Sequence, residues 1–348
     1  MKRIVVASTH EEAGKTSIII GIAKTLSEKN ISCGYMKPLG DRLLYQKKRL
    51  WDYDASLVSN ILGLTEKPED ISLGFDHNKL RFMYDEQSTS KKLKEICNNV
   101  SKDHDVVLIE GGRNLAFGHS VFLDPMTIAR NVDAQLLLIL SGEGSEIVDE
   151  IAFLKNCVLS DSSNLAGVII NQVKDIEEFK NLYIDIFNDL GVPVLGIIPY
   201  EEVLTHFTID YLYKTLFTKI IAGEGGLMNV VNHIFVGAMS AAQVITKPLW
   251  QYENKLIITP GDRIDMITAA LDSSTSGIVL TNNILPDDPI IQSKADARNI
   301  PILLATNDTF AVAKLIDDME ILFTEDETKK ITLLEELVKK HVNLDFLN

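Results

Sequence analysis

Short apolar runs alternate along the chain with longer segments in which apolar residues recur at helical spacing. The runs predict buried strands, and the periodic segments predict amphipathic helices. In the first part of the chain we expect strands at 4–7, 32–36, 105–109, 134–140, 167–172 and 194–199. Helices are expected at 16–30, 52–62, 91–101, 146–159 and 176–190, with an irregular connection at 63–90. This alternation predicts an α/β fold with a parallel sheet covered by helices on both faces.

A second alternating pattern follows the glycines at positions 223, 225 and 226. We expect strands at 233–237, 255–259, 277–281 and 301–305. Helices are expected at 204–216, 290–298, 309–318 and 327–341, and two more are expected, one that starts at about 240 and one that follows 260–263 and ends at 271. Because glycine clusters mark turns and linkers, the domain boundary is predicted there. The expected parts are a first domain at 1–222, a smaller α/β domain at 226–325, and a C-terminal helix within 326–348. That helix is expected to pack on the second domain or to belong to a linker.

The segment between the first strand and the first helix carries the clearest candidate chemistry. It reads Ser-Thr-His-Glu-Glu-Ala-Gly-Lys-Thr over residues 8–16. Amides at a helix N-terminus attract an anion, and Gly14 lets the backbone approach it closely. Lys15 can reach the outer phosphates of a nucleotide, and the Thr16 hydroxyl can ligate Mg²⁺. Thr9 replaces the first glycine of the usual pattern, so the prediction of a nucleotide site depends on the strand–loop–helix context.

Two later strands end in charged residues. Lys37 follows the strand at 32–36, and Glu110 follows the strand at 105–109. Open α/β sheets bind ligands at the carboxyl ends of their strands. An acidic residue there is the usual second Mg²⁺ partner of a P-loop fold, whereas the alternative is a solvated turn carboxylate. Lys37 is either a ligand-binding lysine or a surface lysine.

Composition narrows the possible partners. The chain has 348 residues and a net charge of −15, so we expect neither nucleic acid nor an anionic membrane as a partner. Its three cysteines are scattered, which favours free thiols in a cytoplasmic protein over disulfides or zinc. Because the first expected strand begins close to residue 1, we expect no signal peptide, and the apolar runs are too short to cross a bilayer.

Six motifs in order resemble the dethiobiotin synthetase group of P-loop proteins, which is related to cobyrinic acid diamide synthase and to the MinD/ParA domains. The motifs are the loop at 9–16, Gly-Tyr-Met-Lys-Pro at 34–38, Asp-Tyr-Asp-Ala at 52–55, Val-Leu-Ile-Glu-Gly-Gly at 107–112, Gly-Val-Ile-Ile-Asn at 167–171 and Val-Pro-Val-Leu-Gly-Ile-Ile-Pro at 192–199. His10 replaces the signature lysine of the MinD type, so activation across a dimer in the MinD/ParA manner is not expected.

The resemblance implies a site for ATP and Mg²⁺. The phosphate-binding residues would be Glu11, Glu12, Ala13, Gly14, Lys15, Thr16 and Ser17. Thr16, Asp54 and Glu110 would hold Mg²⁺ directly or through water, and Asn171 would read the adenine edge. Lys15 and Lys37 are the expected catalytic residues, with Lys37 neutralising the transferring phosphoryl group. The residues alone leave other roles open, since Asp54 suits a helix N-terminus and Asn171 suits a strand-end cap.

Residues 225–325 resemble the DRTGG domain through Ile-Ile-Thr-Pro-Gly-Asp-Arg at 257–263. Ile264, Asp265 and Met266 depart from the motif, and Asp262 and Arg263 are expected to have structural roles. The two domains in this order resemble the N-terminal half of long phosphate acetyltransferases. We expect no acetyl transfer domain in this sequence, and therefore no acetyltransferase activity from these residues alone.

Three functions remain open at this stage. The first is a regulatory ATP-binding module that acts on a partner, such as a separate phosphotransacetylase. The second is an ATP-dependent carboxylate–amine ligase that works through an acyl phosphate. The third is a slow ATPase switch. The resemblance also implies a homodimer.

Overall fold

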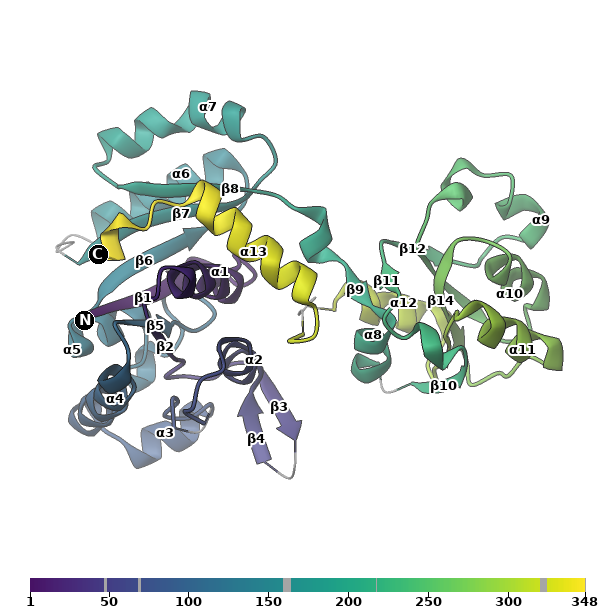
Figure 1. Ribbon diagram of the computed structural model, residues 1–348, viewed down its shortest axis with the longest axis horizontal. Helices are drawn as coiled ribbons and strands as arrows, with labels where there is room; N and C mark the ends of the chain where they lie inside the picture. The colour runs from purple at the N-terminus through teal and green to yellow at the C-terminus, as the bar shows by residue number, and fades with distance from the viewer. Residues whose placement is uncertain (47–48, 68–69, 159–163, 217, 320–323, 348) are drawn as a thin grey trace. The chain divides into compact units, whose positions relative to one another are not determined.

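The computed structural model describes residues 1–46, 49–67, 70–158, 164–216, 218–319 and 324–347 (Figure 1). Contacts divide the chain into two compact units. The first unit comprises Met1–Glu201 and Thr324–Asn348, and the second comprises Glu202–Phe323. This division falls earlier than the predicted boundary at residue 222, because β10 (Lys219–Ala222) pairs with a strand of the second unit.

The first unit is built on a parallel sheet with the strand order β2-β5-β1-β6-β7-β8. The strands are β1 (Lys2–Ser8), β2 (Cys33–Met36), β5 (Val106–Glu110), β6 (Gln135–Leu140), β7 (Leu165–Val173) and β8 (Val194–Pro199). Their central residues are fully buried, as expected for a sheet covered on both faces. The predicted α/β fold class is therefore confirmed.

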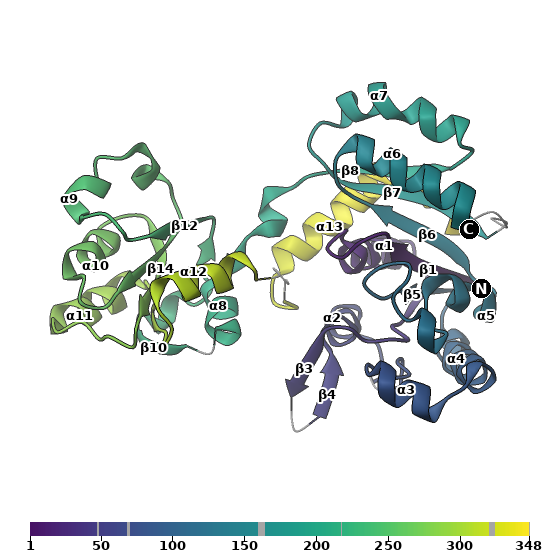
Figure 2. The same cartoon turned by 180° about the vertical axis from the view of Figure 1, so that it is seen from behind.

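Helices lie on both faces of this sheet (Figure 1, Figure 2). The α-helices described in the unit are α1 (Lys15–Glu28), α2 (Tyr53–Leu62), α3 (His77–Met83), α4 (Glu86–Val100), α5 (Pro125–Val132), α6 (Gly144–Phe153), α7 (Ile176–Asp189) and α13 (Thr328–His341). Helix α13 lies in front of the sheet in Figure 1, and α6 lies in front of it in the reverse view of Figure 2.

Several local predictions need correction. The region 63–90 is not an irregular connection throughout, because it contains α3 and the start of α4. Asp76 and Asp85 cap the N-termini of these two helices with their side chains. The expected helix at 146–159 is α-helical only to Phe153 and is followed by a π-helical turn at Leu154–Val158. The predicted last residue, 159, lies outside the described part of the chain. A hairpin of β3 (Leu43–Gln46) and β4 (Arg49–Asp52) precedes α2.

The C-terminal helix packs on the first unit, which corrects both expectations for it. Helix α13 contacts α1 at Gly21, where an added Cβ would lie 2.5 Å from Val338 and 2.7 Å from the Leu334 carbonyl. After α13, Val342 bridges to Gly196 of β8. Lys339 forms an ion pair with Glu28 at the end of α1. The chain therefore returns to its first domain after the second unit is complete.

The second unit has a sheet with the order β10-β15-β14-β13-β12. Its strands after β10 are β12 (His233–Val236), β13 (Lys255–Pro260), β14 (Thr275–Thr281) and β15 (Ile302–Leu304), and β10 pairs antiparallel to β15. Separate apolar cores lie on the two faces. One face contacts α9 (Ala241–Val244), α10 (Ile264–Leu271) and α11 (Pro289–Arg298), and the other contacts α8 (Ile209–Thr215) and α12 (Thr309–Asp317).

The segment 204–216 was expected to form one helix. The structure instead has a short 3-10 turn at Glu202–Thr205, strand β9 (Phe207–Thr208) and then α8. Strand β9 pairs with β11 (Val230–Val231), which interrupts the helical pattern. Among helices formed by the described residues, none has the length and apolar character needed to span a bilayer.

Candidate functional site

The loop between β1 and α1 lies at the carboxyl edge of the sheet. Gly14 precedes α1 with a φ of 92°, a conformation that favours glycine. A Cβ at this position would lie 2.3 Å from the Asn171 side-chain nitrogen, so the loop and the end of β7 are closely packed. Asn171 donates to the Ala13 carbonyl at 2.9 Å, and Gln172 donates to the Glu12 carbonyl at 3.1 Å. These bonds from β7 fix the loop against the sheet.

The Lys15 side chain lies back over the loop. Its amine donates to the Ser8 hydroxyl at 2.8 Å and to the Arg113 carbonyl at 3.4 Å. Burial lowers the pKa of Lys15, and the nearby Glu110 acts in the opposite direction. Among the described residues its hydrogen-bond acceptors are both neutral oxygens, so this buried ammonium retains the capacity to pair with an anion.

The remaining loop residues are more exposed. Glu11 forms an ion pair with Arg113, with 3.0 Å between Oε1 and Nε. Glu12 has a φ of 61°, which places it in the left-handed region. Ser17 is half-buried in the first turn of α1. The loop therefore carries two exposed acidic side chains, Glu11 and Glu12, beside its backbone amides, and Arg113 pairs with the first of them.

Glu110 lies at the end of β5, next to β1 in the sheet. Its carboxylate accepts from Thr16 Oγ1 at 2.8 Å and from Tyr35 OH at 2.7 Å. Burial raises the pKa of Glu110 to about 7, against the opposing effect of Lys37. The structure thus brings together the Thr16 hydroxyl and Glu110, two of the side chains predicted to hold Mg²⁺.

Lys37 is almost completely buried, which excludes a simple surface role. Its amine lies 2.5 Å from Asp54 Oδ2, 2.6 Å from Asp41 Oδ1, 3.4 Å from Asp52 Oδ1 and 3.9 Å from Glu110 Oε1. Burial alone would lower the pKa of Lys37, but these carboxylates hold it well above its usual value. Lys37 is therefore a charged amine enclosed by acidic side chains.

Asp54 belongs to the same buried cluster. Burial raises its pKa, but Lys37 and Arg42 outweigh this effect and hold the pKa below its usual value. Arg42 NH1 lies 3.1 Å from both Asp54 oxygens. The helix N-cap is Asp52 rather than Asp54, because the Ala55 amide donates to Asp52 Oδ1 at 2.9 Å. Asp54 lies in the first turn of α2, as the alternative of a helix N-terminal carboxylate expects, and it is also paired with Lys37 and Arg42.

The site also contains side chains to which the sequence motifs assign no role, namely Ser8, Tyr35, Asp41, Arg42 and Asp52. Asp52 could have been found as an N-cap from the Asp-x-Asp-Ala pattern at the start of α2. The positions of Asp41 and Arg42 could not, because both depend on the hairpin that returns the chain beside Lys37. In the described residues the site therefore contains a larger charge network than the motifs indicate.

The oxygen donors at this edge of the sheet suit Mg²⁺ bound together with a nucleotide. Among the described residues there is no cluster of three or more His, Cys, Asp or Glu side chains arranged to hold a metal. Mg²⁺ bound with a nucleotide commonly uses only one or two carboxylates, with phosphates and waters completing its shell. Glu110, Asp54 and the Thr16 hydroxyl provide oxygen ligands of that kind, so the residues present fit such an ion.

Two family models match parts of this chain. A family model described as AAA domain matches residues 2–208, and one described as DRTGG domain matches residues 211–319. The phosphate acetyltransferase of Nitrosomonas europaea is 23% identical and covers 100% of this chain and 51% of its own length. That of a Synechocystis species is 26% identical and covers 86% and 44%, respectively. The chain spans about half the length of the curated relatives it matches.

A solved structure, the MinC:MinD cell division protein complex of Aquifex aeolicus, is 18% identical. It covers 59% of this chain and 83% of its own chain, with a TM-score of 0.38. The domain pair and its order agree with the predicted resemblance to the N-terminal half of phosphate acetyltransferases, which is thereby confirmed.

Proposed function

Because the chain belongs to the AAA domain family over residues 2–208 and continues into a DRTGG domain, we propose that it binds ATP with Mg²⁺ and acts as a regulatory module. Its partner would be an enzyme of the phosphate acetyltransferase class, either as a separate protein or as a continuation of the same chain. This choice is supported by the names of the relatives, which carry these domains in about half of their length.

The observation that carries the proposal is the convergence of Lys15, Thr16 and Glu110 at one edge of the sheet. A helix N-terminus with a buried lysine is suited to phosphate oxygens. Glu110 accepts from the Thr16 hydroxyl at 2.8 Å, so both would face the same cation. Mg²⁺ would there neutralise phosphate charge, while Lys15 and the loop amides hold the outer phosphates. Asn171 remains a candidate for contact with the base.

The charge network suggests how binding would be transmitted. In the structure Lys37 and Arg42 both pair with Asp54. For Asp54 to ligate a metal, these two ion pairs would have to break at least in part. Arg42 directly precedes β3, so its release would change the support of the hairpin. We therefore propose that Mg²⁺ replaces Lys37 and Arg42 at Asp54 when the nucleotide binds, and that this replacement changes the position of the β3–β4 hairpin. Lys37, once released, would be available to pair with a phosphate group.

Calorimetric titration of the full chain with ATP, with and without Mg²⁺, tests this function. We expect Mg²⁺-dependent binding that weakens about tenfold to a hundredfold in Lys15→Ala, because a charge-assisted hydrogen bond is lost. Lys29→Ala, at the far end of α1, is the matched control and should bind as the unchanged protein does. Equal binding by Lys15→Ala and Lys29→Ala would exclude the loop as the nucleotide site.

An ATP-dependent ligase is the second candidate, and the burial of Lys37 among acidic groups beside the phosphate site favours it. Such an enzyme would release phosphate only when a carboxylate–amine substrate is added. A slow ATPase switch would release phosphate without one. Phosphate release from the folded protein, with and without substrates of this class, distinguishes the two from a module that only binds.

We also propose a cytoplasmic homodimer. The free thiols of Cys33 and Cys97 suit a reducing compartment. His10 bonds to Ser141 of the same chain at 3.0 Å, so it is not available here to reach a partner's nucleotide as the MinD-type lysine would. Light scattering with and without ATP would test the oligomeric state.

A further inference from the structure

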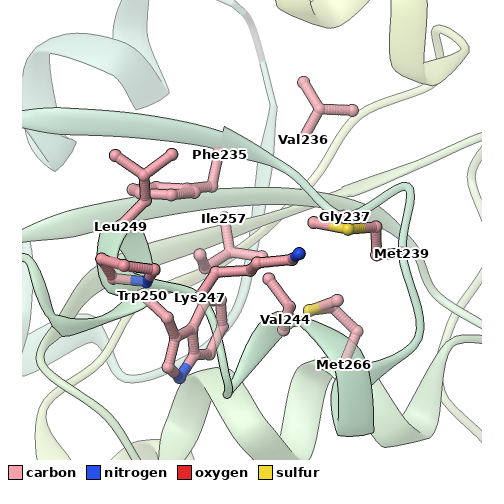
Figure 3. Close-up of a pocket in the computed structure, with 11 residues that line it drawn as sticks. Phe235, Val236, Gly237, Met239, Val244, Lys247, Leu249, Trp250, Ile257 and Met266 are labelled. Atoms are coloured by element: carbon pink, nitrogen blue, oxygen red, sulfur yellow. The ribbon is translucent and has the colours of Figure 1, made fainter.

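A cavity of about 330 Å³ lies in the second unit, between the edge strand β12 and the connection that leads from β12 to β13 (Figure 3). Its walls are almost entirely apolar. Phe235 and Ile257 form the sheet side, Val244 and Met266 come from α9 and α10, and Trp250 closes one end. The phosphate site described above uses none of these residues.

The size and lining of the cavity suit a small organic molecule. Ligand pockets start at about 300 Å³ and are mostly apolar with a few placed polar groups. At about 30 Å³ for each water, the cavity has room for a ligand of about ten non-hydrogen atoms. Phe235 and Trp250 meet edge to face, with ring centroids 6.3 Å apart, so this end of the cavity is shaped by fixed rings.

The lining contains one cationic side chain, Lys247. In Figure 3 its aliphatic chain extends among the apolar side chains, and its amine ends on the side of Gly237. Within the part of the chain that the structure describes, this amine has no hydrogen bond or ion pair. A cation beside an apolar cavity favours a ligand that is apolar over most of its length and anionic at one end.

A second polar group lies at the Gly237 end. Thr259 follows Ile257 by two residues on β13, so both side chains lie on the same face of the sheet. Thr259 is fully buried, and its hydroxyl has no hydrogen-bond partner among the described residues. A Cβ added at Gly237 would lie 3.1 Å from this hydroxyl, which places it directly behind the cavity wall. Buried hydroxyls are normally satisfied, so this one marks the polar end of the site.

The wall beside this end is held by Arg263. Its guanidinium donates to the carbonyls of Gly237 at 3.2 Å and Met239 at 2.8 Å, and it pairs with Asp265 at 3.0 Å. Asp265 in turn accepts from the Ala241 amide at 3.0 Å. Arg263 and Asp265 are therefore used to fix the cavity wall, which leaves Lys247 as the cation available to a ligand there.

We propose that this cavity binds a small carboxylate with an apolar body, with the carboxylate at Lys247 and the apolar part between Phe235, Val244 and Trp250. The second unit would then sense an apolar acid, independently of nucleotide binding in the first unit.

Octanoate and octanamide, which match in shape but differ in charge, are the probes for this site. The two tryptophans lie in different units, so the indole NMR signals of Trp250 and Trp51 provide a reporter and an internal control. Octanoate should shift the Trp250 signal and leave the Trp51 signal unchanged. Octanamide should bind more weakly than octanoate.

Lys247→Gln should weaken octanoate binding about fivefold, the most that a partly exposed ion pair usually contributes. Binding of octanamide should change by less than about twofold. The matched control is Lys314→Gln, an exposed lysine on α12 at the other face of the sheet, which should change neither. Val244→Phe should fill the cavity and abolish binding of both probes.

The proposal is overturned if Trp250 does not respond to octanoate, or if octanamide binds as tightly as octanoate. It is also overturned if Lys247→Gln binds octanoate unchanged. Lys247 is exposed, so this variant keeps the test valid if Val244→Phe does not fold.

Discussion

Both units have a sheet with helices on its two faces, but the side chains that line the candidate site beside the sheet are mostly charged in the first unit and mostly apolar in the second. In the first unit, the carboxyl edge contains Lys15, Lys37 and Arg42 among buried carboxylates. In the second unit, the space beside β12 is an apolar cavity with one lysine in its lining. A parallel sheet with helices on both faces provides positions for a site, and the residues that follow the strands decide what is bound.

Two buried lysines show the difference most directly. The Lys37 amine is surrounded by carboxylates, which raise its pKa despite burial. Burial lowers the pKa of Lys255 in the second unit, where the amine donates to the Tyr252 carbonyl at 2.5 Å and lies 5.4 Å from the centre of the Trp250 ring. Lys37 therefore compensates charge, whereas Lys255 joins two parts of an apolar core.

Replacing these lysines should give the largest contrast. Lys37→Met leaves the buried carboxylates of Asp41, Asp52 and Glu110 without their nearest cation and Asp54 with Arg42 alone, so it should lower the free energy of unfolding of the first unit by about 3–5 kcal/mol. Lys255→Met loses a hydrogen bond but keeps the volume, and should cost the second unit about 1–3 kcal/mol. Urea titrations that follow the indole signals of Trp51 and Trp250 report the units separately. An equal or larger loss in Lys255→Met would show that the carboxylates do not require Lys37.

The pH response of the two units should also differ, because the pKa values of Glu110 in the first unit and Asp265 in the second shift in opposite directions. Burial raises the pKa of Glu110 from 4.5 to about 7, so folding retains a proton that the unfolded chain loses. Stability of the first unit should therefore fall as the pH rises from about 4.5 to about 7, by up to about 3 kcal/mol. Hydrogen bonds from Arg263 lower the pKa of Asp265 to about 2. The contribution of Asp265 to the stability of the second unit is present above about pH 4 and is lost as the pH falls toward 2.

Glu110→Gln isolates this effect, since the amide keeps the shape of the side chain and does not titrate. We expect the variant to lose the decrease in stability between pH 4.5 and 7 that the unchanged protein shows in EDTA. Urea midpoints across this range are the measurement. A decrease of the same size in both proteins would mean that another group titrates there.

The sequence predicted the fold well where the hydrophobic pattern is strong. The buried strands β1, β5, β6 and β8 and the helices α1 and α7 lie within a few residues of their expected positions. Short elements were missed, although two of them had visible signals. Asp76 caps α3, and α5 begins with Asp124 followed by a proline, a pattern typical of helix starts.

The candidate site was predictable in its motifs but not in its network. Strand ends place Lys37 and Glu110 at the same edge of the sheet, and this follows from topology alone. The contacts of Lys37 with Asp41 and Asp52 depend on the β3–β4 hairpin, whose strands lack a clear alternating pattern. Whether a strand-end lysine is buried or solvated depends on such distant contacts, so it could not be read locally.

The smallest expected effect concerns the ion pair of Arg263 and Asp265 in the second unit, which is partly exposed, whereas the pairs of Lys37 are buried. Arg263 and Asp265 form a partly exposed pair, so Asp265→Ala should cost less than about 1 kcal/mol. It should nevertheless speed amide hydrogen exchange at 237–241, because it removes the acceptor of the Ala241 amide and the partner of Arg263. Asp272→Ala is the matched control, since Asp272 also forms surface ion pairs but lies at the other end of α10. If both variants leave exchange at 237–241 unchanged, Arg263 does not fix that wall, and its charge would be free for a ligand as the cations of the first unit are.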